Sequence, residues 1–141
     1  MSQANVEVIR NIYEAWNRGE LDSAFEVFDQ DIEWVLPEGG LNSGVYRGHD
    51  EVRRLLDGYL EAFEFLRPEP ERFFDAEDRI VVFIRTSVRG KGSGAEAAVR
   101  PAHLWTIREG KVVRMEVFPA AKRDQALEAV GLSEPDAHAD S

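Results

Sequence analysis

The sequence predicts an α+β fold in which three helices precede a sheet of mainly antiparallel strands. Two observations support this prediction. In three segments of the first half, apolar residues recur every three or four positions, which is the spacing of one helix face. In the second half, apolar and polar residues alternate and short turns separate the segments, as in antiparallel hairpins. Helices first and a meander after them are typical of the α+β class.

The first predicted helix ends at Gly19, since glycine readily adopts the left-handed conformation of a helix C-cap. Its apolar face consists of Val8, Ile9, Ile12, Tyr13 and Trp16. A short second helix follows in ELDSAFEVFDQD, where Asp22 in the first turn favours the helix dipole. The third helix has His49 or Asp50 as its expected N-cap and ends before Pro68. Its apolar stripe is Val52, Leu55, Leu56, Tyr59, Leu60 and Phe63.

The strands are predicted from alternation between turn residues. In DIEWVLPEGG, the residues Ile32, Trp34 and Leu36 alternate until Pro37 ends the strand, and NSGVYRGHD is expected to be a loop. Later strands are expected near 71–76 and over about 80–89, 95–108 and 112–118. KRDQALEAVGL predicts a last short helix. We expect one domain over residues 1–132 and a disordered tail over 133–141, because SEPDAHADS is small and acidic.

The composition argues against several classes of partner. There are 27 acidic and 17 basic residues, a net charge of -10, which repels nucleic acid and anionic membrane surfaces. There is no cysteine, so thiolate zinc sites and thiol nucleophiles are excluded. The start of the chain lacks the pattern of a signal peptide, and no run of about 20 apolar residues occurs. We therefore expect a cytoplasmic protein without nucleic-acid or membrane partners.

Alternation also predicts which side of each strand points inward. In the last hairpin, the larger apolar face consists of Val99, Pro101, His103, Trp105, Ile107, Val113, Met115 and Val117. We expect this face, including His103, to lie against the helices. The opposite face combines an apolar centre with a charged rim, the pattern of a symmetric interface, and predicts a homodimer. It consists of Ala102, Leu104, Thr106, Val112 and Phe118 among Arg100, Arg108, Arg114 and Glu116.

The strand over about 80–89 is ambiguous. Apolar content favours burial of the face made by Ile80, Val82, Ile84, Thr86 and Val88. The other face carries Val81, Phe83, Arg85 and Ser87. Periodicity alone therefore leaves Arg85 undecided.

The order of elements and several phrases are similar to a known family. IYEAWNRGELDSAFEVFDQDIEW, VYRGHDEVRRLL, GKGSGAE, HLWTIREGKVVRMEVF and ALEAVGL resemble the SnoaL-like branch of the NTF2-like superfamily, which includes ketosteroid isomerase. The resemblance spans about Val6 to Leu132. It implies a cone in which a curved sheet and three helices enclose a pocket, and pairing into homodimers. Because this fold supports unrelated chemistries, the resemblance does not specify the reaction.

The isomerase pattern, laid over this sequence, implies a set of positions on the pocket side: Trp34, Leu36, Val81, Phe83, Arg85, His103, Met115 and Val117. The carboxylate base falls at Leu36, which cannot take a proton. The oxyanion-binding tyrosine falls near Ile12, with Tyr13 one residue away and turned elsewhere. His103 takes the position of the second, proton-donating carboxyl group. Two of the three functional positions are thus replaced, and steroid isomerisation by that mechanism is not expected.

His103 and Arg85 are the candidate catalytic residues. A histidine near its usual pKa exchanges protons at neutral pH or donates a hydrogen bond, and an arginine holds an oxygen with its fixed fork of donors. We expect the arginine to depress the histidine's pKa, which favours a neutral ring that acts as a base. The competing interpretations are a core histidine bonded to a neighbour and an ion pair of Arg85 with Glu33 or Glu38.

The expected ligand contacts are apolar and aromatic, as in pockets for flat hydrophobic molecules. They are Trp34, Leu36, Phe83, Trp105, Met115, Val117, Tyr13, Tyr59 and Phe63; Trp16 adds to the aromatic interior. Most such residues are ordinary core. Tyr46 and His49 could reach the cavity mouth but equally fit a loop and a helix cap, and Glu38 is a weak substitute for the missing base.

We expect neither a metal nor a cofactor. The histidines have no metal-ligand spacing, and GKGSG joins two strands without the spacing of a phosphate-binding loop. The resemblance then implies an enzyme of isomerase, cyclase, dehydratase or hydrolase type that acts on a small apolar, oxygen-bearing molecule. The alternatives are a non-catalytic ligand-binding module and a dimerisation module whose pocket is filled.

Overall fold

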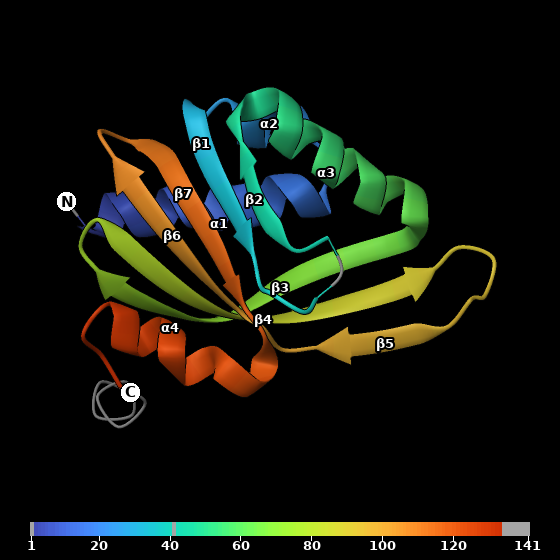
Figure 1. Cartoon of the computed structure of the whole chain (residues 1–141). Coiled ribbons are helices and arrows are strands. Elements are labelled where there is room, and N and C mark those ends of the chain that lie inside the picture. The colour runs from blue at the N-terminus through green and yellow to red at the C-terminus, as the bar shows by residue number, and fades with distance from the viewer. Residues whose placement is uncertain (1, 41, 134–141) are drawn as a thin grey trace.

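The computed structural model describes residues 2–40 and 42–133 and has the predicted α+β architecture (Figure 1). The helices are α1 (Ser2–Asn17), α2 (Leu21–Phe25), α3 (Gly48–Ala62) and α4 (Arg123–Ala129), with a 3₁₀ turn at Ala120–Lys122. The strands are β1 (Phe28–Leu36), β2 (Gly44–Arg47), β3 (Phe63–Ala76), β4 (Arg79–Gly90), β5 (Glu96–Val99), β6 (Ala102–Arg108) and β7 (Lys111–Phe118). The predicted tail lies outside the described residues from position 134 onward.

The strands form one curved, open sheet in the order β2-β1-β7-β6-β4-β3, and β5 pairs with β4. The pairing of β1 with β7 is parallel and the other pairings are antiparallel, so the sheet is mixed. In Figure 1, β5 and the end of β4 extend as an arm beyond the body of the molecule. Within the described part of the chain, no helix is both long and apolar enough to cross a membrane.

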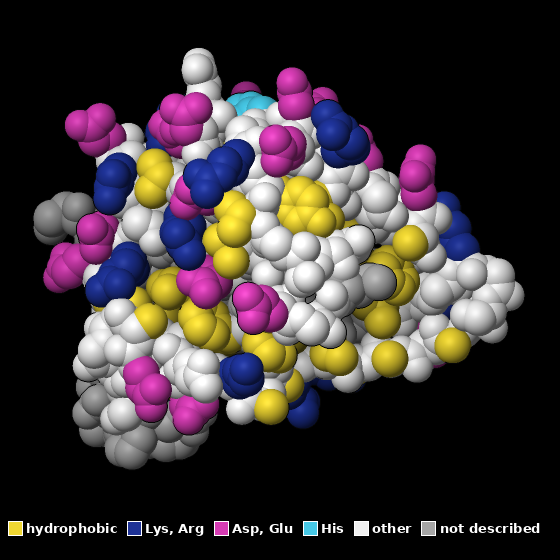
Figure 2. Space-filling model, viewed as in Figure 1, with side chains coloured by type: hydrophobic (Ala, Val, Ile, Leu, Met, Phe, Trp, Pro, Cys, Tyr) yellow, Lys and Arg dark blue, Asp and Glu magenta, His cyan; other side chains and the backbone are white. Residues whose placement is uncertain are grey.

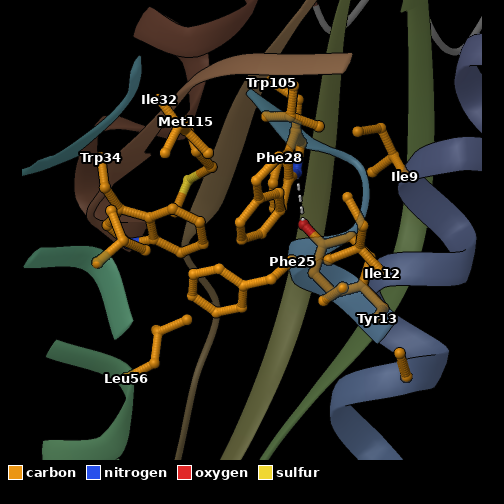
Figure 3. Packing of buried hydrophobic residues seen from close by; sticks show 14 of the residues in the cluster. Ile9, Ile12, Tyr13, Phe25, Phe28, Ile32, Trp34, Leu56, Trp105 and Met115 are labelled. Carbon is orange, nitrogen blue, oxygen red and sulfur yellow. Dashed lines mark hydrogen bonds between the residues drawn. The ribbon is translucent and has the colours of Figure 1, made fainter. Parts of the chain in front are cut away.

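Helices cover both faces of the sheet. The three N-terminal helices pack on the inner face around a large core that includes Ile9, Ile32, Phe28, Trp105 and Met115 (Figure 3). On the outer face, α4 covers a smaller cluster. We call this the outer cluster; it consists of Phe74, Val81, Phe83, Ala102, Leu104, Ala126 and Leu127.

The strand β3 is longer than predicted. It begins at Phe63, directly where α3 ends, instead of near residue 71, and it contains Pro68 and Pro70. Prolines are tolerated here because β3 is an edge strand. It pairs with a neighbour on one side only, so a missing N–H does not disrupt hydrogen bonds to a second strand. The helix α1 lies along this edge: the Trp16 indole donates to the Leu66 carbonyl at 2.7 Å, and the Asn17 amide donates to the Pro68 carbonyl at 2.9 Å.

Four other boundaries differ from the sequence-based expectation. The strand β1 begins at Phe28, inside the segment predicted to be the second helix. The segment expected to be a loop before α3 contains β2. The strand predicted over 95–108 is divided into β5 and β6, because Pro101 has no N–H for continuous pairing. The N-cap of α3 is Arg47, so the predicted caps His49 and Asp50 lie inside the first turn.

A bulge in β7 reverses the predicted facing of Val112 and Val113. Thr106 pairs with Arg114, but the next residue, Ile107, pairs with Val112, so Val113 is an extra residue in its strand. Such an extra residue exchanges the inward and outward positions on one side of the bulge. Val112 is therefore fully buried in the inner core, and Val113, predicted to face inward, is only half-buried.

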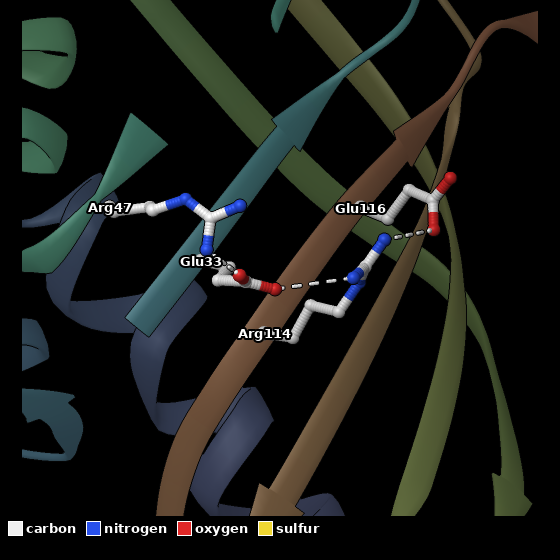
Figure 4. Close-up of polar contacts among 4 residues, drawn as sticks. All are labelled: Glu33, Arg47, Arg114 and Glu116. Carbon is white, nitrogen blue, oxygen red and sulfur yellow. Dashed lines mark hydrogen bonds and ion pairs between the residues drawn. The ribbon is translucent and has the colours of Figure 1, made fainter. Parts of the chain in front are cut away.

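The surface predicted as a dimer interface is partly covered by the chain's own last helix. Ala102 and Leu104, the predicted apolar centre, are buried against Ala126 and Leu127 of α4. Beside this cluster, charged groups occupy the outer face (Figure 2). Glu33 pairs with Arg47 and with Arg114 at 3.2 Å, and Arg114 pairs with Glu116 at 3.4 Å (Figure 4). Homodimerisation itself stays a prediction.

Candidate functional site

A cavity of about 300 Å³ lies between the inner face of the sheet and the N-terminal helices. Most of its described lining is apolar or aromatic. Nine of the predicted site residues line it: Tyr13, Trp34, Leu36, Tyr59, Phe63, His103, Trp105, Met115 and Val117. Their role as ligand contacts stays a prediction, but the fold brings them to one space from α1, α3, β1, β3, β6 and β7.

A polar network of three rings lies in the wall of this cavity. The Trp105 indole N–H donates to the Tyr13 hydroxyl at 2.8 Å (Figure 3), and the Tyr13 hydroxyl is bonded to His103 Nδ1 at 2.7 Å. Tyr13 reaches this network from α1, and the other two rings come from alternate positions of β6. Trp105 packs edge-on against Trp34, with ring centroids 5.7 Å apart.

The network determines which nitrogen of His103 carries the proton. The indole can only donate, so the Tyr13 oxygen accepts that bond. If Nδ1–H also donated to the hydroxyl, the hydroxyl hydrogen would have no partner, which costs about 1–3 kcal/mol for a buried group. The hydroxyl therefore donates to Nδ1, and His103 is the Nε2–H tautomer. Nε2 has no hydrogen-bond partner among the described residues, and His103 lines the cavity.

Burial sets the protonation state of the network. It lowers the pKa of His103 from 6.5 to about 4, so the ring is neutral at pH 7. Burial also raises the pKa of Tyr13 well above its usual value, against the opposing effect of the hydrogen bond from Trp105, so the hydroxyl keeps its proton. With Nδ1 occupied and Nε2 protonated, His103 is a hydrogen-bond donor toward the cavity. The predicted role of base at pH 7 does not fit this arrangement.

A second polar group lies near the cavity mouth. Asn42 and Tyr59 both line the cavity, and the Tyr46 hydroxyl donates to the Asn42 carbonyl at 2.8 Å. Burial raises the pKa of Tyr59, the neighbouring Tyr46 adds to this rise, and a hydrogen bond with the Asn42 side chain opposes it. Sequence analysis missed Asn42, and its only signal was its place in the turn-rich segment between two strands. Tyr46, for which a place at the cavity mouth was one of two interpretations, is not among the residues that line the cavity.

The comparisons with known proteins identify the family of this chain. A model of the SnoaL-like domain matches residues 9–115. The chain belongs to the SnoaL-like family. An uncharacterized protein of Mycobacterium tuberculosis, Rv0034, is 27% identical over 118 residues, which cover 83% of this chain and 89% of that protein.

Solved structures show the same fold. An NTF2-like protein of unknown function from Burkholderia pseudomallei superposes with a TM-score of 0.75 at 28% identity, covering 87% of this chain and 96% of the other. TerC, co-crystallized with polyporic acid, superposes with a TM-score of 0.74 at 30% identity, covering 89% of this chain and 98% of TerC. This SnoaL-like chain therefore has the NTF2-like fold that its sequence predicts.

Arg85 does not lie in the cavity of this SnoaL-like domain. Ile80, Val82 and Ile84 point into the inner core, so strict alternation along β4 turns Arg85 to the outer face. Its guanidinium contacts the Ser87 hydroxyl at 3.0 Å and the Glu69 carboxylate at 3.9 Å. The predicted pairing with His103 is wrong, and so are its predicted ion-pair partners, Glu33 and Glu38.

Phe83 and Val81 are likewise misplaced by the family overlay. Both belong to the outer cluster under α4, and Phe83 does not line the cavity. The overlay was wrong by one position in this strand, which exchanges the two faces. The periodicity of the sequence was correct here, since Thr86 and Val88, on the face that it favoured, both line the cavity.

The remaining candidates have structural contacts. Tyr13 points into the core and bonds to His103, so the prediction that it turns elsewhere is wrong. His49 Nε2 bonds to the Phe28 carbonyl at 2.9 Å and does not line the cavity. Glu38 is exposed outside the cavity. Among the residues that the structure describes, no cluster of three metal-ligating side chains occurs.

Proposed function

We propose that this SnoaL-like domain binds a small apolar, oxygen-bearing molecule in the cavity and acts on it without a cofactor. The observation that carries the proposal is the polar network in an otherwise apolar wall: His103 lines the cavity, its Nδ1 is bonded to Tyr13, and its Nε2 has no partner among the described residues. A few convergent donors are what fix the orientation of a ligand in an apolar pocket. A neutral donor aimed at an oxygen also stabilises negative charge that develops there during isomerisation, cyclisation or dehydration.

A ligand screen tests this proposal directly. The screen covers steroids, polyketides and terpenoids, and it includes polyporic acid, with which TerC was co-crystallized. We expect at least one ligand class to raise the melting temperature. Two members of that class should then compete with each other for binding in the cavity. If every class leaves the melting temperature unchanged and calorimetry detects no binding, the proposal is wrong.

The substitution His103→Phe separates turnover from folding, because it keeps a ring and removes the donor. We expect turnover of a confirmed substrate to fall about 10²- to 10³-fold, the usual cost of losing one such donor. Arg85→Ala is the matched control, since its side chain lies on the outer face. Equal turnover in His103→Phe and the wild type would show that the ring has no chemical role.

A specific observation favours the non-catalytic alternative, a binding module. Among the described residues that line the cavity there is no aspartate or glutamate, and the lining includes Leu36, where the resemblance to the isomerase implies the carboxylate base. Without a group that accepts a proton, the site is suited to holding a ligand rather than to proton abstraction. This alternative would be supported if the chain binds some of these compounds but no enzyme assay detects turnover of them.

Homodimerisation is a separate proposal, supported by the uncovered part of the outer sheet face. The charged groups of Glu33, Arg47, Arg114 and Glu116 form a self-complementary set there. We expect sedimentation at micromolar concentration to give twice the 16.0 kDa chain mass, and a monomer alone would reject the dimer. Leu104 is buried under α4, so a substitution there would not test the interface alone. Arg114 is exposed, and Arg114→Glu should weaken the dimer.

A further inference from the structure

The described part of the cavity wall offers a ligand only neutral polar groups. No lysine or arginine, and no carboxylate, is among the residues that line it there. The chain as a whole carries a net charge of -10, which also disfavours the approach of anions. An ionised ligand would leave water without meeting an opposite charge, which is costly in an apolar site. The wall therefore favours an uncharged ligand.

The Trp105–Tyr13–His103 network restricts the ligand further. The only hydrogen of the Tyr13 hydroxyl is used on Nδ1, and the only indole hydrogen of Trp105 is used on the Tyr13 oxygen. Neither hydrogen is left for a ligand. What remains at this point of the wall is Nε2–H of His103, which is complementary to an acceptor atom and not to another N–H or O–H donor.

We propose that Tyr13 and Trp105 are positioning residues that hold His103 as a donor, so that the cavity selects neutral ligands with a carbonyl-type oxygen over their hydrocarbon and carboxylate analogues. This inference rests on the proposed function, because it assumes that the cavity binds a ligand. The other polar side chains of the described lining do not impose the same selection. The amide of Asn42 and the hydroxyls of Thr86 and Tyr59 both donate and accept, so they accommodate either kind of ligand atom.

The first test reads the tautomer in the free protein. Long-range proton–nitrogen NMR of uniformly ¹⁵N-labelled protein at pH 7 distinguishes a protonated from an unprotonated ring nitrogen, and His103→Phe identifies which signals belong to this ring. We expect Nε2 to be protonated and Nδ1 unprotonated. In Tyr13→Phe, Nδ1 loses its partner, and we expect a mixture of both tautomers. A protonated Nδ1 in the wild type would overturn the inference.

Tyr46→Phe is the matched control for this measurement. It also removes one tyrosine hydroxyl, but that hydroxyl bonds to the Asn42 carbonyl and has no contact with the network. We expect it to leave the His103 signals unchanged. If Tyr46→Phe and Tyr13→Phe shift the tautomer equally, the positioning role of Tyr13 is refuted.

The second test measures selectivity with three probes of nearly equal shape. They are 2-acetylnaphthalene, 2-isopropenylnaphthalene, in which CH₂ replaces the oxygen, and 2-naphthoate, which is anionic. In the wild type we expect the ketone to bind about three- to tenfold more tightly than the hydrocarbon, the usual worth of one neutral hydrogen bond. The carboxylate should bind most weakly. In Tyr13→Phe the ratio of ketone to hydrocarbon affinity should fall toward one, whereas Tyr46→Phe should retain it.

The outcomes separate this inference from the proposed function. Equal affinity of the ketone and the hydrocarbon in the wild type, or an unchanged ratio in Tyr13→Phe, would overturn the inference while ligand binding stands. If none of the three probes nor any compound of the ligand screen binds, the proposed function is wrong, and the selectivity fails with it. If Tyr13→Phe does not fold, Trp105→Phe replaces it, because that substitution removes the indole N–H but keeps a ring against Trp34.

Discussion

The inner and outer faces of the sheet bury similar apolar side chains, but they pack differently. On the outer face, α4 approaches closely because Ala102 and Ala126 are small, and the outer cluster closes over fully buried residues. On the inner face, Trp34 and Trp105 meet edge-on, and a cavity of about 300 Å³ remains beneath the helices. The difference teaches that the same strands can serve stability on one side and a ligand site on the other.

The largest effect is expected in the outer cluster. Leu127 is fully buried there, so Leu127→Ala should lower the free energy of unfolding by about 2–5 kcal/mol, through lost burial and the cavity left behind. Chemical denaturation measures this loss. The ketone-to-hydrocarbon affinity ratio should stay at its wild-type value below the unfolding midpoint. A changed ratio would mean that the two faces are coupled.

Acid should destabilise the inner face through His103. Its pKa is about 4 when folded and 6.5 when exposed, so between these values the unfolded chain binds more protons. Its contribution is therefore fully present above pH 6.5 and is lost as the pH falls toward 4, a change of about 3 kcal/mol at about 1.4 kcal/mol per pKa unit.

The pH effect is measured by urea denaturation at pH 7 and pH 4 in the wild type and in His103→Phe. Carboxylates contribute to acid unfolding in both proteins, so the difference between their pH dependences isolates the histidine. We expect the wild type to lose more stability on acidification than the variant. Identical losses would contradict the low pKa of this ring.

Two matched substitutions to leucine compare the space available on each face. Ala126 lies in the closed outer cluster, so Ala126→Leu should cost about 1–3 kcal/mol by overpacking. Ala24 lines the cavity, so Ala24→Leu has room and should change stability by less than about 1 kcal/mol. Only Ala24→Leu should weaken probe binding. Equal destabilisation by the two substitutions would show that the inner cavity is not open.

The smallest effect is expected for Arg85→Ala. The Arg85 side chain is 42% exposed, and its contact with Glu69 is a surface ion pair of the kind that contributes little. We expect a change in stability within about 0.5 kcal/mol and no change in probe affinity. A large loss of ligand affinity would mean that the arginine reaches the ligand after all.

Local patterns predicted most of the elements and failed where pairing or packing overrides them. The helices, the strand at Ile32 to Leu36 and the final hairpin follow from periodicity. The start of β3 was hidden because prolines normally end a strand, and only the position of β3 at the sheet edge makes Pro68 and Pro70 compatible with pairing. The bulge at Val113 was equally invisible, since nothing local in the alternation marks an extra residue.

The candidate site was predicted in part. His103 was placed on the inner face by alternation, and the structure puts it there; the family overlay misplaced Arg85 and Phe83 by one residue of register. Tyr13 was expected to turn elsewhere, because the overlay places the functional tyrosine one residue earlier, near Ile12. Its actual partner, His103, lies 90 residues away in the sequence. Contacts at such separation depend on how α1 crosses the sheet, which no local pattern specifies.

The sequence by itself determined the fold class, the absence of thiol chemistry, and an inward histidine among aromatic residues, because these follow from composition and from the two-residue and 3.6-residue periods of the backbone. The tertiary structure decided what that histidine can do. Burial lowers its pKa, Tyr13 and Trp105 fix its tautomer, and α4 covers part of the sheet face that was predicted to be free. Protonation, tautomer and exposure depend on neighbours brought together from distant parts of the chain, so they are set only when the chain has folded.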